Sequence, residues 1–179
     1  LGRSGSPMRL FYPDRVAKTV YHPFVATPSP IGLAHRGGGR EAPENSLTAF
    51  RNAADIGFEY FETDVRATSD GKVMVFHDAN LNRVTDRVGR ISALPYSEVR
   101  RAKVGGSDRV LRLEELLEEF DDKYINIDVK DDHTVEPFVR LIKQKKVGER
   151  ICVGSFSALR VRAIRSALGT SAASSLTPP

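Results

Sequence analysis

Short apolar segments alternate with segments of helical periodicity along most of this chain. The apolar segments are expected to form strands at residues 31–34, 58–65, 73–76, 124–129 and 151–153. Segments with helical spacing follow the first strand, flank the fourth and follow the fifth. Single strands that alternate with helices of this length favour a parallel sheet covered by helices, which is the α/β class.

The helical segments repeat apolar side chains at intervals of three and four residues. The clearest repeats are Leu113, Leu116, Leu117 and Phe120, and then Val135, Phe138, Val139 and Ile142. An earlier helix is expected to begin after Asn45 or Ser46, because either side chain can accept hydrogen bonds from first-turn amides, and to end at Gly57. A last helix is expected to follow Ser157 as its N-cap.

Histidines and carboxylates lie where the first strands end. His35 follows the first strand and His77 the third, while Glu62 and Asp64 occupy alternate positions in the second. Residues at i and i+2 of a strand point to the same side, and paired carboxylates suit a hard cation such as Ca²⁺ or Mg²⁺. Two histidines can share the proton transfers of a substitution at phosphorus. The pattern therefore predicts a metal-assisted acid–base site for a phosphate ester.

An ordered set of short motifs resembles the glycerophosphodiester phosphodiesterase family. The motifs are His35-Arg36-Gly37, Pro43-Glu44-Asn45-Ser46, Glu62-x-Asp64, Thr68-x-Asp70-Gly71, His77-Asp78, Ile127-Asp128-Val129-Lys130 and Ser155-Phe156-Ser157. Each motif alone is weak, but their order and spacing together are specific. The similarity extends over roughly residues 31–168.

The resemblance implies a TIM (β/α)8 barrel of the PLC-like phosphodiesterase type, which binds a divalent cation and hydrolyses glycerophosphodiesters to glycerol 3-phosphate and an alcohol. A complete barrel usually needs about 250 residues, whereas this chain has 179 and five to six β/α units. We therefore expect a barrel that is incomplete at its C-terminus, with an open edge that favours self-association.

The resemblance also suggests a domain organisation. Residues 1–30 are expected to be an irregular lead-in, of which residues 1–7 resemble a tag remnant or an upstream extension. Residues 31–179 are expected to form the phosphodiesterase-like domain. Residues 80–110 lack long periodicity and are expected to form a small insertion above the mouth of the barrel.

The central site residues follow from the same motifs. His35 and His77 are the predicted acid–base pair, and Glu62, Asp64 and Asp128 are the predicted ligands of a Ca²⁺ or Mg²⁺ ion. Members of the family usually carry Glu where Asp128 stands. Because Asp is one methylene shorter, this ligand would need a closer backbone or an intervening water molecule.

The surrounding residues receive supporting roles. Arg36 offers a planar guanidinium that matches phosphate oxygens, and Lys130 adds positive charge on the same strand face as the third carboxylate. Glu44, Asn45 and Asp78 are predicted to form hydrogen bonds to the residues that contact the cation or the phosphate, and so to hold those residues in position.

The connection between the second and third strands is short. Asp64 and His77 must reach the same end of the sheet to share a site, but residues 65–72 are too few for a helical crossover. The resemblance favours an extended return with a turn at residues 69–71 and a parallel pair of strands. The alternative is a hairpin, which is expected to place Asp64 and His77 at opposite ends.

Composition excludes several other classes. No segment approaches the roughly 18 apolar residues needed to span a membrane, and the single Cys152 excludes an internal disulfide and is expected to be a buried structural thiol. The net charge is +4, and the basic residues at 140–165 lack interleaved aromatic residues, so a solvated helix face is favoured over a nucleic-acid surface. We expect a cytoplasmic protein with a small-molecule substrate and neither a nucleic-acid partner nor stable membrane insertion.

Three alternatives remain open. The chain could be a catalytically silent metal-binding fragment whose pocket is incomplete. It could be a related lipase of the lysophospholipase D or sphingomyelinase D type, although residues 80–110 carry six arginines and no apolar loop for lipid. A nucleic-acid-binding module is supported only by the local basic charge.

Overall fold

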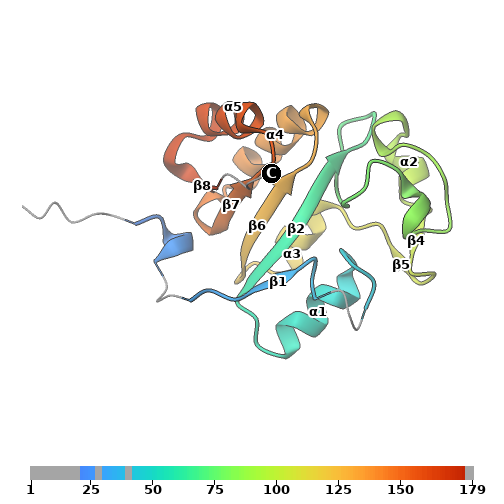
Figure 1. The fold of residues 1–179 in the computed structure, drawn as a ribbon, viewed down its shortest axis with the longest axis horizontal. Helices are drawn as coiled ribbons and strands as arrows, with labels where there is room; N and C mark the ends of the chain where they lie inside the picture. The colour runs from blue at the N-terminus through green and yellow to red at the C-terminus, as the bar shows by residue number, and fades with distance from the viewer. Residues whose placement is uncertain (1–20, 27–29, 39–41, 176–179) are drawn as a thin grey trace, which may run out of the picture.

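The computed structural model describes residues 21–26, 30–38 and 42–175, which are arranged around one twisted sheet (Figure 1). Its parallel strands lie in the order β1 (Leu33–His35), β2 (Tyr60–Ala67), β6 (Tyr124–Val129), β7 (Ile151–Gly154) and β8 (Ala173–Ser174). Among the described residues, β1 and β8 each have a strand on one side only. The predicted α/β class with a parallel sheet is confirmed.

Helices connect the parallel strands in the predicted places. They are α1 (Leu47–Asp55) after β1, α3 (Leu113–Glu119) before β6, α4 (Val135–Lys145) between β6 and β7, and α5 (Ala158–Leu168) between β7 and β8. None of the helices in the described part of the chain is both long and apolar enough to cross a membrane.

Serine side chains cap the N-termini of two of these helices. The Oγ atom of Ser46 accepts a hydrogen bond from the amide of Ala49 at 3.1 Å, so Ser46 rather than Asn45 is the N-cap of α1. Ser157 does the same for the amide of Arg160 at 3.3 Å at the start of α5. Both caps satisfy amides that have no partner within the helix.

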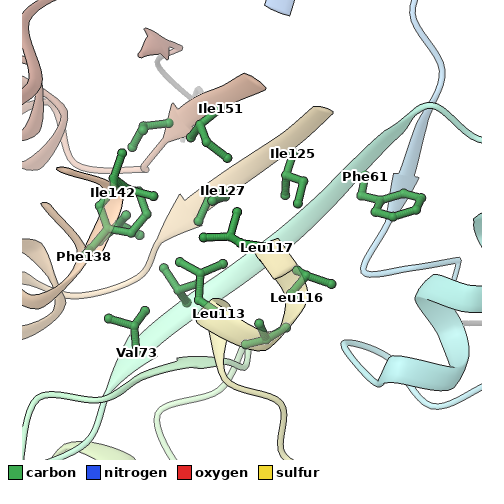
Figure 2. Close-up of a cluster of buried hydrophobic side chains, with 14 of the residues drawn as sticks. Phe61, Val73, Leu113, Leu116, Leu117, Ile125, Ile127, Phe138, Ile142 and Ile151 are labelled. Carbon is green, nitrogen blue, oxygen red and sulfur yellow. The ribbon is translucent and has the colours of Figure 1, made fainter. Parts of the chain in front are cut away.

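One apolar core joins the sheet to the helices. Figure 2 shows leucine side chains of α3 packed over isoleucine side chains of β6, with side chains from β7 and α4 beside them. Leu113, Leu116, Leu117, Ile125 and Ile127 are all at most 2% exposed. Burial of each such side chain contributes about 1.5–3 kcal/mol relative to exposure, which is why the predicted helical spacing holds α3 against the sheet.

Strand β3 (Val73–Val75) contradicts the predicted parallel connection. It pairs antiparallel to β2, and the paired positions are Val65–Val75, Arg66–Met74 and Ala67–Val73. The turn is closed by the amide of Thr68, which donates to the carbonyl of Lys72 at 2.9 Å. The segment is therefore a hairpin, and the expected extended return is wrong.

The hairpin nevertheless brings His77 to the right end of the sheet. β2 continues past Asp64 as far as Ala67 before it turns, and β3 returns over the same length. The amide of Phe76 then donates to the carbonyl of Asp64 at 2.8 Å. Because the outward and return paths are equally long, His77 arrives at the level of Asp64, and the expected separation does not occur.

Residues 80–110 form a small unit beside the end of β2 (Figure 1). The unit contains η2 (Leu81–Arg83), η3 (Ile91–Ala93), α2 (Tyr96–Val99) and the hairpin of β4 (Lys103–Val104) and β5 (Asp108–Arg109). Its buried side chains make a second apolar cluster with Met74 and Phe76. This separate core explains why the segment has no long periodicity.

The two ends of the described chain add smaller elements. Phe24, within η1 (Pro23–Val25), packs edge-on against Tyr60 and Tyr124 at ring distances of 5.3 and 5.9 Å. It covers the amino ends of β2 and β6, while most of the predicted lead-in, residues 1–20, lies outside the described residues. Strand β8 follows the five strands expected from the sequence.

Candidate active site

The carboxyl ends of β1, β2 and β6 bring most of the predicted residues together. His35 on β1 is the register partner of Glu62 on β2, and Asp64 is the partner of Asp128 on β6. Side chains at paired positions of neighbouring parallel strands lie side by side. The prediction that these residues share one end of the sheet is supported by this register.

Asp64 lies at the centre of this group. Its side chain is 2% exposed, and its Oδ1 atom lies 2.7 Å from Nζ of Lys130. Its Oδ2 atom lies 3.0 Å from Nε of Arg36 and accepts a hydrogen bond from Nδ2 of Asn45 at 3.1 Å. A buried carboxylate needs such partners to remain charged, and here two cations and an amide supply them.

Asn45 holds its position through a buried network. Its Oδ1 atom accepts a hydrogen bond from Oγ1 of Thr63 at 2.8 Å while its amide donates to Asp64. Its φ of +58° lies in the left-handed region, which asparagine tolerates better than most residues. Asn45 is thus bonded to Asp64, while Ser46 is the helix cap.

Glu62 lies next to this group with 14% of its side chain exposed, and its surroundings disfavour the charged form. Its Oε2 atom accepts a hydrogen bond from the amide of Arg36 at 3.2 Å and lies 3.7 Å from Nε2 of His35. Burial disfavours the charged form, and the nearby Asp64 charge adds repulsion, so the pKa of Glu62 is raised to about 7. The His35 side chain itself is 69% exposed.

Lys130 links the carboxylates of β2 and β6. Its Nζ atom lies 2.7 Å from both Oδ1 of Asp64 and Oδ2 of Asp128. Burial lowers the pKa of Lys130, but the hydrogen bonds to both carboxylates outweigh burial and raise the pKa above its usual value. The ring of Phe156 lies over the ammonium group at 5.2 Å from its centre. Lys130 is thus a fixed positive charge at the site.

His77 is held by Asp78 on the other side of the site. The Nδ1 atom of His77 lies 2.6 Å from Oδ1 of Asp78, and its backbone carbonyl accepts a hydrogen bond from Nε of Arg66 at 2.8 Å. The predicted partner of Asp78 was an unspecified neighbour, and the structure identifies it as His77 itself. Two contacts, one from the ring and one from the backbone, fix the position of this histidine.

Arg83 connects the His77–Asp78 pair to the loop before α1, and it was not among the predicted site residues. It bonds to both carboxylate oxygens of Asp78 and to both of Glu44, and Glu44 in turn accepts a hydrogen bond from Arg36 at 3.3 Å. Arg83 belongs to the insertion, which has no periodic pattern to mark it. Its spacing of five residues from Asp78 was the only available signal.

Ser155 does not belong to this group. It is fully buried, and its hydroxyl donates to the carbonyl of Val129 at 2.8 Å. It also accepts a hydrogen bond from Arg160 at 2.8 Å. These bonds hold the end of β7 against β6, so Ser155 is a structural residue.

The residues predicted to hold a cation are suitable in their chemistry. Glu62, Asp64 and Asp128 supply only carboxylate oxygens, the ligands that Ca²⁺ and Mg²⁺ prefer. The Oδ1 atom of Asp128 is buried and has no hydrogen-bond partner among the described residues. Within those residues, however, no three His, Cys, Asp or Glu side chains are gathered closely enough to hold a metal ion. Lys130 lies between two of the three carboxylates instead.

Comparison with known proteins gives one consistent result. Residues 35–172 match the glycerophosphoryl diester phosphodiesterase family. "Probable glycerophosphodiester phosphodiesterase 2" of Mycobacterium tuberculosis is 40% identical over 133 residues, which are 74% of this chain and 50% of that protein. "Lysophospholipase D GDPD1" of Rattus norvegicus is 37% identical over 129 residues, or 64% of this chain and 41% of that protein.

Solved structures show the same fold. The glycerophosphodiester phosphodiesterase of Agrobacterium tumefaciens superimposes with a TM-score of 0.72 and 28% identity, over 77% of this chain and 63% of that chain. A phosphodiesterase of Oleispira antarctica in complex with the product sn-glycerol-3-phosphate gives a TM-score of 0.73 and 25% identity, over 82% of this chain and 65% of that chain.

The matches also show how much of its relatives' length the chain spans. It spans about half the length of the curated relatives that it matches. Its parallel strands and connecting helices form part of a TIM barrel, in agreement with the predicted incomplete barrel. From the match over residues 35–172 and the identity to its relatives, the chain belongs to the glycerophosphoryl diester phosphodiesterase family.

Proposed function

We propose that this protein is a metal-dependent phosphodiesterase that hydrolyses glycerophosphodiesters to glycerol 3-phosphate and an alcohol by histidine acid–base catalysis. The observation that carries the proposal is the placement of two fixed cations, Arg36 and Lys130, on the same buried carboxylate at the end of the sheet. They lie 3.0 and 2.7 Å from Asp64. Two positive charges at one point suit a phosphodiester, which carries a negative charge that grows in the transition state.

The proton transfers are assigned to His35 and His77. During hydrolysis a new P–O bond forms to the nucleophile, and the P–O bond to the alcohol breaks. One histidine takes the proton of the nucleophile, and the other gives a proton to the departing alkoxide oxygen, so charge is balanced at both oxygens. The nucleophile is either water itself or the glycerol 2-hydroxyl, and the second route passes through a cyclic phosphate.

The carboxylates are assigned to the cation. Glu62, Asp64 and Asp128 would hold Ca²⁺ or Mg²⁺, which when bound supplies positive charge to the phosphate oxygens. The unpartnered Oδ1 atom of Asp128 and the raised pKa of Glu62, about 7, both fit a group of carboxylates that can take up a further positive charge. Asn45 keeps Asp64 in place through its amide, 3.1 Å away.

A small polar alcohol fits the surroundings of His77 better than a lipid does. A pocket of about 460 Å³ adjoins this histidine, and it is lined by Arg66, His77, Asp78, Ala79, Asn80, Asn82 and Arg83. Six of its seven lining residues carry polar or charged side chains and none carries a large apolar side chain, whereas acyl chains are bound by apolar surface. The relative named lysophospholipase D makes lipid substrates the natural comparison.

The test measures products from two substrates. The purified protein is incubated with glycerophosphocholine or with lysophosphatidylcholine, each with Ca²⁺, with Mg²⁺ or with EDTA. We expect glycerol 3-phosphate and choline from the first substrate, loss of activity in EDTA and recovery with added cation.

The other outcomes separate the alternatives. Faster release of choline from lysophosphatidylcholine would assign the protein to the lysophospholipase D type. Cation binding by calorimetry without turnover of either substrate would identify the catalytically silent, metal-binding alternative.

A further inference from the structure

Arg83 binds two carboxylates that come from different parts of the chain. Its Nε and Nη2 atoms lie 2.6 and 2.9 Å from the two carboxylate oxygens of Asp78, which follows β3. Its Nη2 and Nη1 atoms lie 2.6 and 3.1 Å from the two oxygens of Glu44, which precedes α1. Both contacts are bidentate, and this geometry is available to arginine but not to lysine.

The contact with Asp78 determines which nitrogen of His77 carries a proton. The hydrogen bonds from Arg83 hold the pKa of Asp78 far below its usual range, so this side chain is a carboxylate and can only accept hydrogen bonds. Its Oδ1 atom lies 2.6 Å from Nδ1 of His77. Nδ1 must therefore be the protonated nitrogen, and Nε2 is left to exchange a proton.

The backbone of the insertion holds Arg83 at this place. Leu81, in the same short helix, is 1% exposed and belongs to the second apolar cluster. Its amide donates to the carbonyl of Gly89 at 2.9 Å, and its carbonyl accepts from the amide of Thr85 at 3.2 Å. The Arg83 side chain itself is 48% exposed, and half-exposed ion pairs add little to stability. The arrangement therefore serves geometry more than folding.

We propose that Arg83 is a positioning residue for His77. Through Asp78 it fixes the ring in the tautomer whose Nε2 atom faces the reaction. Through Glu44, which also bonds to Arg36, it holds the loop that carries a phosphate-binding arginine at a set distance from that ring. This inference rests on the proposed function in one respect, because it assumes that His77 transfers a proton.

The first measurement needs no substrate. Nitrogen-15 spectra of the histidine rings report which nitrogen is protonated in the neutral form, and the signal of His77 is assigned from its absence in His77→Ala. We expect Nδ1–H in the parent protein. In Arg83→Met, Asp78 loses both of its bonds to Arg83, and we expect a mixture of the two tautomers.

Two variants make this comparison specific. Arg83→Lys keeps the charge but cannot bond to two carboxylates in a bidentate way, so it should restore the parent tautomer only in part. Arg101→Met is the matched control, since Arg101 lies in the same insertion and makes one exposed contact, with Glu98 at 3.1 Å. Amide spectra of each variant verify that the fold is kept.

The second measurement is kinetic. Arg83→Met should lower kcat for glycerophosphocholine by about 10–100-fold, as expected when a residue that orients a reacting side chain is lost. Arg101→Met should leave kcat unchanged. In a His77→Ala background, Arg83→Met should cost little more, because residues that act through one another are not additive.

Different outcomes contradict the role of Arg83 and the proposed function. An unchanged Nδ1–H tautomer in Arg83→Met, or a full additional loss in the His77→Ala background, would overturn the role of Arg83. Absence of phosphodiesterase activity in the parent protein would instead overturn the proposed function, and the tautomer comparison would still decide whether Arg83 orients His77.

Discussion

Asp64 and Asp128 are register partners on the parallel strands β2 and β6, and the ammonium group of Lys130 lies 2.7 Å from an oxygen of each. The same two carboxylates are assigned to a divalent cation. If the proposed cation binds there, it would compete with the ammonium group for the space between them, and Lys130 would have to turn away. This movement would direct the Lys130 charge toward a bound phosphate.

Replacement of Lys130 tests this competition. In Lys130→Met we expect tighter cation binding by calorimetry, because the internal competitor is gone. We expect kcat to fall by about 10²–10³-fold, the usual effect of removing one group that stabilises transition-state charge. Weaker cation binding in this variant would show that Lys130 supports the site and does not compete for it.

The carboxylates should be essential for cation binding. Glu62→Gln combined with Asp64→Asn removes two of the three assigned ligands with almost no change in size, and we expect no binding of Ca²⁺ or Mg²⁺ by calorimetry. Glu136→Gln is a suitable control, because its side chain is 75% exposed on α4. Unchanged affinity in the double variant would remove the metal site from this account.

The two histidines should be essential for the rate but not for the cation. His35→Ala and His77→Ala should each lower the rate roughly 10²–10⁴-fold, the usual contribution of a positioned acid or base. Cation affinity should survive both changes. His22→Ala serves as the control, since His22 lies in the lead-in and bonds to the amide of Phe24. A variant that hydrolyses glycerophosphocholine at the parent rate would make that histidine structural.

The outer strand β1 should make the isolated 179-residue chain prone to associate. Among the described residues it pairs only with β2, and Leu33 and Ile56 beside it are 41% and 72% exposed. Unpaired strand edges bind other edges, so we expect self-association in size-exclusion chromatography and broad thermal melting.

A charge on this edge should reduce the association. Leu33→Lys places a lysine on the exposed edge, and Leu159→Lys, at an exposed position on α5, is its control. A monodisperse, cooperatively melting parent chain would contradict the prediction.

Cys152 should report on the docking of β8. Burial raises the pKa of this thiol, and the side chain is 8% exposed where β7 pairs with Ala173. The thiolate is the reactive form, so iodoacetamide should modify the native protein far more slowly than the unfolded chain. Ala173→Pro, which disturbs β8, should speed the modification. Equal rates in native and unfolded protein would show that this edge opens freely.

Much of the fold could be predicted because its patterns are local. The apolar repeats of α3 and α4 and the strand at Tyr124–Val129 follow directly from residue spacing. The orientation of β3 was mispredicted because the Asp70–Gly71 turn suits either path, and only the length of β2 past Asp64 decides between them. Strand β8 is two small residues long, too short to give a pattern.

In the candidate site, too, residues on regular strands could be predicted and residues on irregular backbone could not. Glu62, Asp64 and Asp128 could be placed together because strand periodicity and parallel register are regular. Arg83 could not, because its position depends on how the irregular backbone of the insertion folds back on itself. The amide of Ile91 donates to the carbonyl of Ala79 at 3.0 Å where this backbone folds back. No local sequence pattern predicts that hydrogen bond.

The number of residues in the β2–β3 hairpin determines where His77 lies relative to Asp64. The amide of Phe76 bonds to the carbonyl of Asp64, so an insertion or deletion of one residue would shift this register and displace His77 along the sheet. The turn depends on its own side chains, because Oγ1 of Thr68 bonds to Asp70 and to the amide of Lys72, and Gly71 has a φ of +76°. The segment from residue 65 to residue 76 is thus expected to resist changes in length.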